Sequence, residues 1–188
     1  PNSSAASRHA SRISQLTRRS STRSSPPAPC SSSAPCWQSS LRLNTGSTFS
    51  QFQQINPVVK APTFVCNDGE ILMDSTLILE YAEALAHPRT LVPSGPGELQ
   101  RELRIIGLAL AACEKCVQII YEGALRPPQK VHEPWVTRIT GQMLAAYEAL
   151  ENELARRPLT VTSSGITQAG VTTAVCWHFT QQSRPEVV

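Results

Sequence analysis

Two short segments, Ala61-Pro62 and Asp74-Ser75, carry groups that can bind an extended peptide and an anion. Lys60 precedes Ala61-Pro62, and Asp74-Ser75 follows further along the chain. A proline held cis at the mouth of a strand leaves the backbone N–H and C=O of Ala61 free to pair with an extended peptide. At a helix start, free N–H groups and the Ser75 hydroxyl favour a carboxylate. The occurrence of both segments in this order predicts a ligand site. Taken alone, Pro62 could equally be an ordinary trans proline, and Asp74-Ser75 could be only a helix cap.

The cysteines offer a second candidate chemistry. Cys113-Glu114-Lys115-Cys116 has the C-x-x-C spacing of metal and redox sites. It lies inside a predicted helix, without a second pair or His cluster nearby, so we expect ordinary helix residues with Cys113 on the buried stripe and no metal. No signal peptide is recognisable, which predicts free thiols in the cytoplasm. No apolar run approaches the length that spans a membrane.

The ligand-binding candidates need a hairpin and a helix to position them. Residues 64–66 and 71–73 read as two short strands joined by Asn67-Asp68-Gly69, which is a hairpin turn. Asp74-Ser75 then begins a segment with apolar residues at helical spacing, so one of the two residues should be the N-cap. A helix therefore starts where the second strand ends.

These residues carry a resemblance to a known family. The pattern NP-x-x-K-x-P-T-x-x-x-x-x-G-x-x-L-x-D-S-x-x-I-x-x-Y from residue 56 to 81 resembles the second half of the thioredoxin-like domain of bacterial-type glutathione S-transferases. The resemblance implies that the backbone of Ala61, beside a cis Pro62, binds the cysteinyl part of glutathione. Asp74 and Ser75 would bind the γ-glutamyl amine and carboxylate, and Lys60 the glycyl carboxylate. Ala61 is smaller than the Val or Ile usual there, which leaves a backbone contact unaffected.

The chain downstream is similar to the all-helical second domain of that family. A Pro- and Gly-rich linker precedes a long helix, Pro127-Pro128 ends it, and a further helix ends near Arg157-Pro158. The predicted apolar stripe of the long helix is Leu99, Leu103, Ile106, Leu110, Cys113, Val117 and Ile120, and that of the next is Trp135, Ile139, Met143, Ala146, Leu150 and Leu154. The fold class expected is thus a thioredoxin-like α+β domain followed by an all-α domain.

The last predicted helix departs from the family pattern. Thr167 can cap it, but Gly170 replaces the Asp that reciprocates in the family's capping box. We expect the fold to be weakened by about 1 kcal/mol for the cap and ~1 kcal/mol for a glycine in a helix. The chain also stops at Val188, where family members usually continue, so the helical domain is expected to be incomplete. Tyr121 is a candidate for the acceptor pocket, with a half-buried core position as the alternative.

The first 47 residues resemble no strand-helix-strand unit. Fourteen of the first forty residues are Ser, and seven basic side chains but no acidic one precede Asp68. From Asp68 onward, ten basic side chains face fourteen acidic ones, so the formal net charge of +3 hides a basic tail on an acidic body. This composition predicts disorder.

Four explanations of this tail are open. An organellar transit peptide is Arg- and Ser-rich, yet the chain begins with Pro1 and shows no amphipathic helix. A nucleic-acid arm would have more aromatic residues and Lys. A solvated linker is the third, and a frame-shifted coding region, with sense resuming near Ser47, is the interpretation we favour. We therefore divide the chain into residues 1–47, the half thioredoxin-like domain 48–88, a linker 89–97 and the helical domain 98–188.

The resemblance implies a detoxifying transferase. The glutathione thiolate would attack an electrophilic small molecule, in a cytoplasmic homodimer whose Ala82-Glu83-Ala84 faces the partner, without nucleic acid or membrane. A Tyr, Ser or Cys at the end of the first strand would stabilise the thiolate. No residue matches that position, because Ser24-Ser25-Pro26 and Cys30 lie in a tail that contains such strings by chance. The alternative is a non-catalytic fragment or interaction module without the thiol-activating residue.

Overall fold

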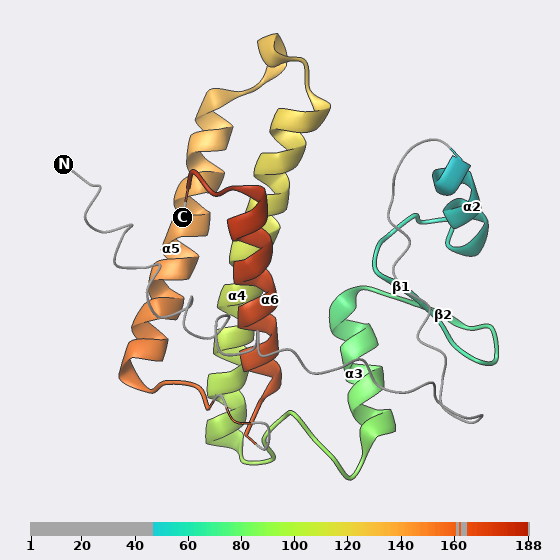
Figure 1. Ribbon diagram of the computed structural model, residues 1–188, viewed down its shortest axis with the longest axis vertical. Helices are drawn as coiled ribbons and strands as arrows, with labels where there is room; N and C mark the ends of the chain where they lie inside the picture. Colours follow the sequence, from blue (N-terminus) through green and yellow to red (C-terminus); the bar gives the residue numbers. More distant parts are fainter. Residues whose placement is uncertain (1–46, 161, 163–164, 188) are drawn as a thin grey trace. The chain divides into compact units, whose positions relative to one another are not determined.

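The computed structural model describes residues 47–160, 162 and 165–187, and these form two compact units (Figure 1). One unit ends at Thr90 and the other begins at Leu91. The predictions for the Ser- and Arg-rich tail, including Ser24, Ser25, Pro26 and Cys30, lie outside the described residues. The domain boundaries proposed from the sequence stay predictions.

The first unit contains a hairpin between two helices. Its elements are α2 (Ser47–Ile55), β1 (Thr63–Val65), β2 (Ile71–Met73) and α3 (Ser75–Ala86). The two strands are antiparallel, with Phe64 opposite Leu72. Gly69 has φ of 90° in the turn, a backbone conformation that glycine adopts without steric cost. The predicted hairpin and the helix that follows it are confirmed.

Asn56 connects the end of α2 to the hairpin. Its side chain is fully buried, its Nδ2 donates to Thr63 Oγ1 at 2.8 Å, and its Oδ1 accepts from Val58 N at 3.0 Å. A buried amide is stable only when it is hydrogen-bonded in this way. Asn56 therefore fixes the loop that leads to β1.

The second unit is a bundle of helices. It contains α4 (Pro96–Leu125), the 3₁₀ turn η1 (Pro128–Lys130), α5 (Glu133–Arg156) and α6 (Gln168–Ser183). Proline is tolerated in the first turn of a helix, and Pro96 stands there in α4. Figure 1 shows α4 and α5 as an antiparallel hairpin, with α6 beside α4. The predicted long helix, the break after it and the next helix are confirmed.

The buried face of α4 is displaced by one residue from the predicted stripe. The buried apolar residues are Ile105, Ala109, Ala112, Cys116 and Ile119. Leu103 is 58% exposed, so its placement on the buried stripe was wrong. Cys113 is partly buried and packs against the core beside the fully buried residues. The small alanine side chains on the buried face let the neighbouring helices approach α4 closely. The prediction from the sequence had instead placed the larger apolar side chains, one position further along, on the buried face.

The start of α6 is capped from two directions. Thr167 Oγ1 accepts from Gly170 N at 3.4 Å, as predicted. The carboxylate of Glu102, on α4, also accepts from Ala169 N at 3.0 Å. Glu102 is 6% exposed. A carboxylate from a neighbouring helix therefore binds the first turn of α6, where the family's Asp is replaced by glycine.

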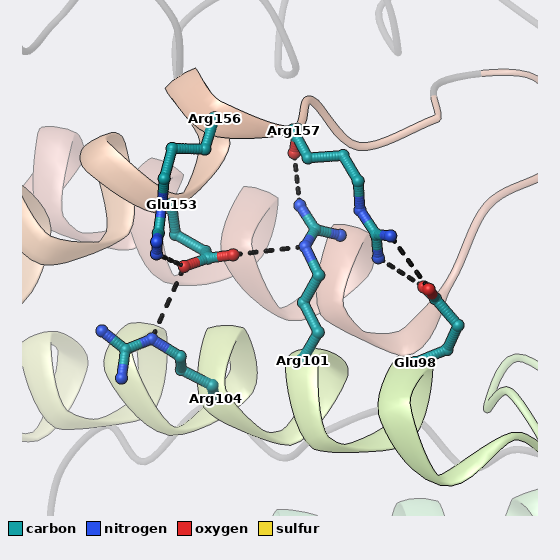
Figure 2. A network of polar contacts seen from close by, with 6 residues as sticks. All are labelled: Glu98, Arg101, Arg104, Glu153, Arg156 and Arg157. Atoms are coloured by element: carbon teal, nitrogen blue, oxygen red, sulfur yellow. Dashed lines mark hydrogen bonds and ion pairs between the residues drawn. The ribbon is translucent and has the colours of Figure 1, made fainter.

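An ionic network joins α4 to the end of α5 (Figure 2). Glu153, which is buried, pairs with Arg101 at 3.3 Å, with Arg104 at 3.6 Å and with Arg156. Figure 2 also shows the guanidinium of Arg157 bound to Glu98. These contacts hold the two helices together at the end opposite their connection.

The described residues contain neither a candidate membrane span nor a candidate metal site. Among them, no helix has both the length and the apolar character needed to cross a membrane. Within the same residues, no group of three or more His, Cys, Asp or Glu side chains is arranged to hold a metal ion.

Candidate functional site

The hairpin brings the two halves of the predicted site together. Thr63 at the start of β1 pairs with Met73 at the end of β2. Lys60 Nζ lies 3.1 Å from Asp74 Oδ2, so the segment just before β1 and the residue just after β2 meet at the same end of the hairpin. Residues far apart in sequence thus meet because β1 begins just after Ala61-Pro62 and β2 ends just before Asp74-Ser75.

The backbone at Ala61 is open. The Ala61-Pro62 peptide bond is cis, as expected. Ala61 is exposed, and neither its N–H nor its C=O forms a hydrogen bond to another residue in the part of the chain that the structure describes. An extended peptide can pair with such a segment as an added strand.

Asp74 is the N-cap of α3 and half of an ion pair. Its Oδ1 accepts from Thr76 N at 3.0 Å, and its Oδ2 lies 3.1 Å from Lys60 Nζ. The backbone hydrogen bond from Thr76 and the bond to Lys60 lower the pKa of Asp74 from its usual value, so the carboxylate is ionised at neutral pH. Asp74 has φ of 75°, a strained conformation that proteins retain mainly at functional sites.

Ser75 is the first residue of α3 and is half-buried. Among the described residues, neither its backbone N–H nor its hydroxyl has a hydrogen-bond partner. Two donors at the positive end of a helix dipole are therefore left without an acceptor among the described residues. This is the arrangement that binds a carboxylate.

Tyr121, the acceptor-pocket candidate, lies near the end of α4 and is 59% exposed. The alternative interpretation of Tyr121 as a half-buried core residue was therefore wrong. Its role toward an acceptor substrate stays a prediction.

No structural role for Asn56 was predicted from its position in the sequence. This residue supports the site because its Nδ2 also lies 3.4 Å from the Lys60 carbonyl oxygen, next to Ala61-Pro62. An Asn-Pro pair after a helix signals a turn, but the burial of Asn56 depends on its contacts with Thr63 and Met73 of the hairpin. The Lys60–Asp74 ion pair was missed as well, since each residue was assigned to a separate end of the ligand.

A known family model matches part of the chain. Residues 38–90 match the family model described as "Glutathione S-transferase, N-terminal domain", a match that begins inside the segment predicted as low-complexity. No curated protein matches the chain.

Several solved structures share the fold. A glutathione transferase family member from Pseudomonas fluorescens Pf-5 with bound glutathione is 24% identical over 73% of this chain and 65% of that one, with a TM-score of 0.62. The glutathione S-transferase of Methylobacillus flagellatus KT, also with glutathione bound, is 20% identical over 72% and 66%, with a TM-score of 0.62. One from Methylobacterium radiotolerans JCM 2831, in complex with glutathione sulfonate, is 20% identical over 76% and 65%, with a TM-score of 0.60.

The fold class is thus that of a thioredoxin-like domain, of which a two-stranded hairpin and flanking helices are described, followed by a mostly helical region. The architecture is that of the glutathione S-transferases, and the resemblance predicted from the sequence is confirmed. The chain spans 65% of the length of the Pseudomonas protein.

Proposed function

We propose that the chain binds glutathione at the end of the hairpin. The observation that carries the proposal is the juxtaposition of an open Ala61 backbone, an ionised Asp74 and the unpartnered donors of Ser75. Glutathione is an extended tripeptide with one ammonium group and two carboxylates. Its backbone can pair with Ala61, its ammonium group with Asp74, and a carboxylate with the donors of Ser75. Solved relatives of this fold hold glutathione, which supports the proposal.

The Lys60–Asp74 ion pair opens when glutathione binds. Asp74 exchanges Lys60 for the γ-glutamyl ammonium, and Lys60 turns to the glycyl carboxylate. Both side chains are about half exposed, 50% for Lys60 and 43% for Asp74, so their pair is worth only about 0–1 kcal/mol and is readily replaced. The γ-glutamyl carboxylate accepts from the Ser75 N–H and hydroxyl.

The reaction proposed is conjugation of glutathione to a small electrophile. The glutathione thiolate attacks an electrophilic carbon, and binding both reactants in one site lowers the barrier by aligning them. We propose a cytoplasmic homodimer with a detoxifying role, in which the segment 82–84 of α3 faces the partner. The residue that activates the thiol is unassigned.

The binding experiment is calorimetry of glutathione with the purified chain. Ser75→Ala removes one donor to a charged group and should weaken binding by roughly 1–2 kcal/mol, which is about a 5- to 30-fold rise in Kd. Ser50→Ala, on an exposed face of α2, is the matched control and should leave Kd unchanged. Equal affinities for the wild type and Ser75→Ala would refute the site.

A second candidate function is a non-catalytic fragment or interaction module. It is favoured by α3, in which no residue is buried and Leu77 and Leu85 are each 57% exposed. Turnover of an activated aryl chloride with glutathione supports the transferase. Failure to bind a glutathione resin, together with strong binding of a dye that reports apolar surface, supports the fragment.

A further inference from the structure

The ionic network between α4 and the end of α5 holds more positive than negative charge. Figure 2 shows its six members, the arginines Arg101, Arg104, Arg156 and Arg157 and the carboxylates Glu98 and Glu153. Four guanidinium groups and two carboxylates leave a formal charge of +2. Since Arg157 pairs with Glu98, the remaining three arginines share one carboxylate.

The shared carboxylate of Glu153 leaves most of the donors around it unpaired. Arg101 Nε donates to its Oε1 at 3.3 Å, and Arg156 Nη2 donates to its Oε2. Arg104 Nε lies 3.6 Å from Oε2, which is too far for a hydrogen bond. Among the described residues, Arg104 therefore has no hydrogen-bond partner and Arg156 uses one nitrogen atom. Each guanidinium group carries five N–H donors, so both side chains can bind a further acceptor.

Arg104 and Arg156 approach the same oxygen atom of Glu153 from different helices. Figure 2 shows their guanidinium groups on one side of the carboxylate, Arg104 from α4 and Arg156 from α5, with Arg101 on the other side. The side chain of Arg104 is 59% exposed and that of Arg156 is 70% exposed. Two adjacent guanidinium groups with free donors and access to solvent can bind one oxyanion between them, because the planar fork of arginine matches the geometry of phosphate oxygens.

The other acidic side chains of these turns lie on different faces of the two helices. Successive residues of an α-helix are rotated by about 100°, so Glu148 and Glu151 lie on the side of α5 away from Glu153. On α4, Glu102 is buried and accepts from the first turn of α6. Within the part of the chain that the structure describes, Glu153 is therefore the one carboxylate that pairs with the two exposed arginines.

We propose that Arg104 and Arg156 form a binding site for a dianionic phosphate group, either free phosphate or a small phosphate monoester, between α4 and α5. A dianion matches the formal charge of +2 of the network, which a chloride ion does not. The phosphate oxygens accept from the free donors of both arginines, and Glu153 keeps Arg101 through its other oxygen. These residues belong to the helical unit, so the proposal is independent of the one for glutathione, whose residues lie in the other unit.

The first test is thermal unfolding of the full chain at pH 8, where phosphate is dianionic, in phosphate and in chloride at equal ionic strength. A ligand that binds only the folded chain raises the Tm as its concentration passes the Kd. A larger Tm in inorganic phosphate than in chloride is expected. An equal rise with phenyl phosphate supports a site for monoesters, and a rise with inorganic phosphate alone supports a site for the free ion. The absence of a rise with either compound would overturn the proposal.

Variants separate this site from a general effect of salt. Arg104→Gln and Arg156→Gln each remove one guanidinium group and should raise the Kd for phosphate, measured by calorimetry without glutathione, at least about fivefold. Arg138→Gln, an exposed position on α5, removes the same charge and should leave the Kd unchanged. Either arginine variant is sufficient if the other fails to fold, because the two side chains act on the same ligand. A Kd that is equal in the wild type and the folded arginine variants, or that rises as much in Arg138→Gln, would overturn the proposal.

Discussion

Asp74 serves both the structure and the proposed site. One carboxylate oxygen caps α3 through Thr76 N, and the other faces Lys60. Ser75, the next residue, keeps its donors for a ligand. A single charged residue at the junction of β2 and α3 can therefore fix the helix start and present a negative charge to an ammonium group.

The charge of Asp74 can be tested separately from its capping. Asp74→Asn keeps an oxygen that accepts from Thr76 N, so α3 should persist by circular dichroism. The loss of the charged partner should weaken glutathione binding by about 1.5–3 kcal/mol in calorimetry. Asp68→Asn, in the hairpin turn, is the control and should bind like the wild type. An Asp74→Asn variant with wild-type affinity would show that the ammonium group is bound elsewhere.

Asn56 should support the site through its buried hydrogen bonds. Asn56→Ala leaves Val58 N and Thr63 Oγ1 without their partner and should cost about 1–3 kcal/mol in the free energy of unfolding measured with urea. Glutathione binding should weaken too, because the loop next to Ala61 loses its anchor. Gln53→Ala, exposed on α2, should change neither quantity. Unchanged stability of Asn56→Ala would mean that water replaces the amide.

At the scale of elements, short-range sequence signals predict how a helix begins but not which of its faces is buried. Thr167 was predicted as a cap and caps α6, because its hydroxyl needs only a backbone N–H three residues ahead. The buried stripe of α4 was misplaced, because the facing helices, and not the largest side chains, decide which residues are covered. The contribution of Glu102 to the cap is 67 residues distant in sequence and had no local signal.

Because Glu102 caps α6, a substitution that removes its charge should be compensated in part by a substitution that restores a cap within α6. Glu102→Gln should destabilise the helical unit by about 1–2 kcal/mol in urea unfolding, since the charged acceptor of Ala169 N is lost. Glu114→Gln, exposed on the same helix, should cost less than about 0.5 kcal/mol.

Gly170→Asp restores the family's capping box without a steric clash, because a Cβ at this position makes only van der Waals contact, with the nearest atom 3.9 Å away. It should recover part of the loss in the Glu102→Gln background. Strict additivity of the two changes would indicate that Glu102 does not act through the cap.

At the scale of the whole molecule, the ionic network closes the α4–α5 pair at its open end (Figure 2). Burial raises the pKa of Glu153, but the charges of Arg156 and Arg101 outweigh it and lower the pKa below its usual value. A carboxylate whose pKa is lower in the folded state stabilises the fold above its unfolded pKa. That stabilisation is lost as the pH falls through the folded pKa.

Glu153 is therefore expected to contribute to acid unfolding. Glu153→Gln should cost about 1–3 kcal/mol at pH 7. Its free energy of unfolding should also fall less than that of the wild type between about pH 5 and pH 3. Glu148→Gln, an exposed position on α5, should follow the wild type at every pH. Parallel pH profiles for Glu153→Gln and the wild type would contradict the assignment.

The sequence alone determined the features that depend on near neighbours. The hairpin, a helix cap at Asp74 or Ser75, the cap at Thr167 and the ends of the long helices follow from turn residues, prolines and polar side chains acting over a few positions. Tertiary structure decided the contacts between distant segments, namely Glu102 with the start of α6, Glu153 with Arg101, and the set of residues that α4 buries. Those contacts depend on how the helices pack against one another. The apolar periodicity of a helix alone is compatible with more than one choice of buried face, so the sequence did not decide between them.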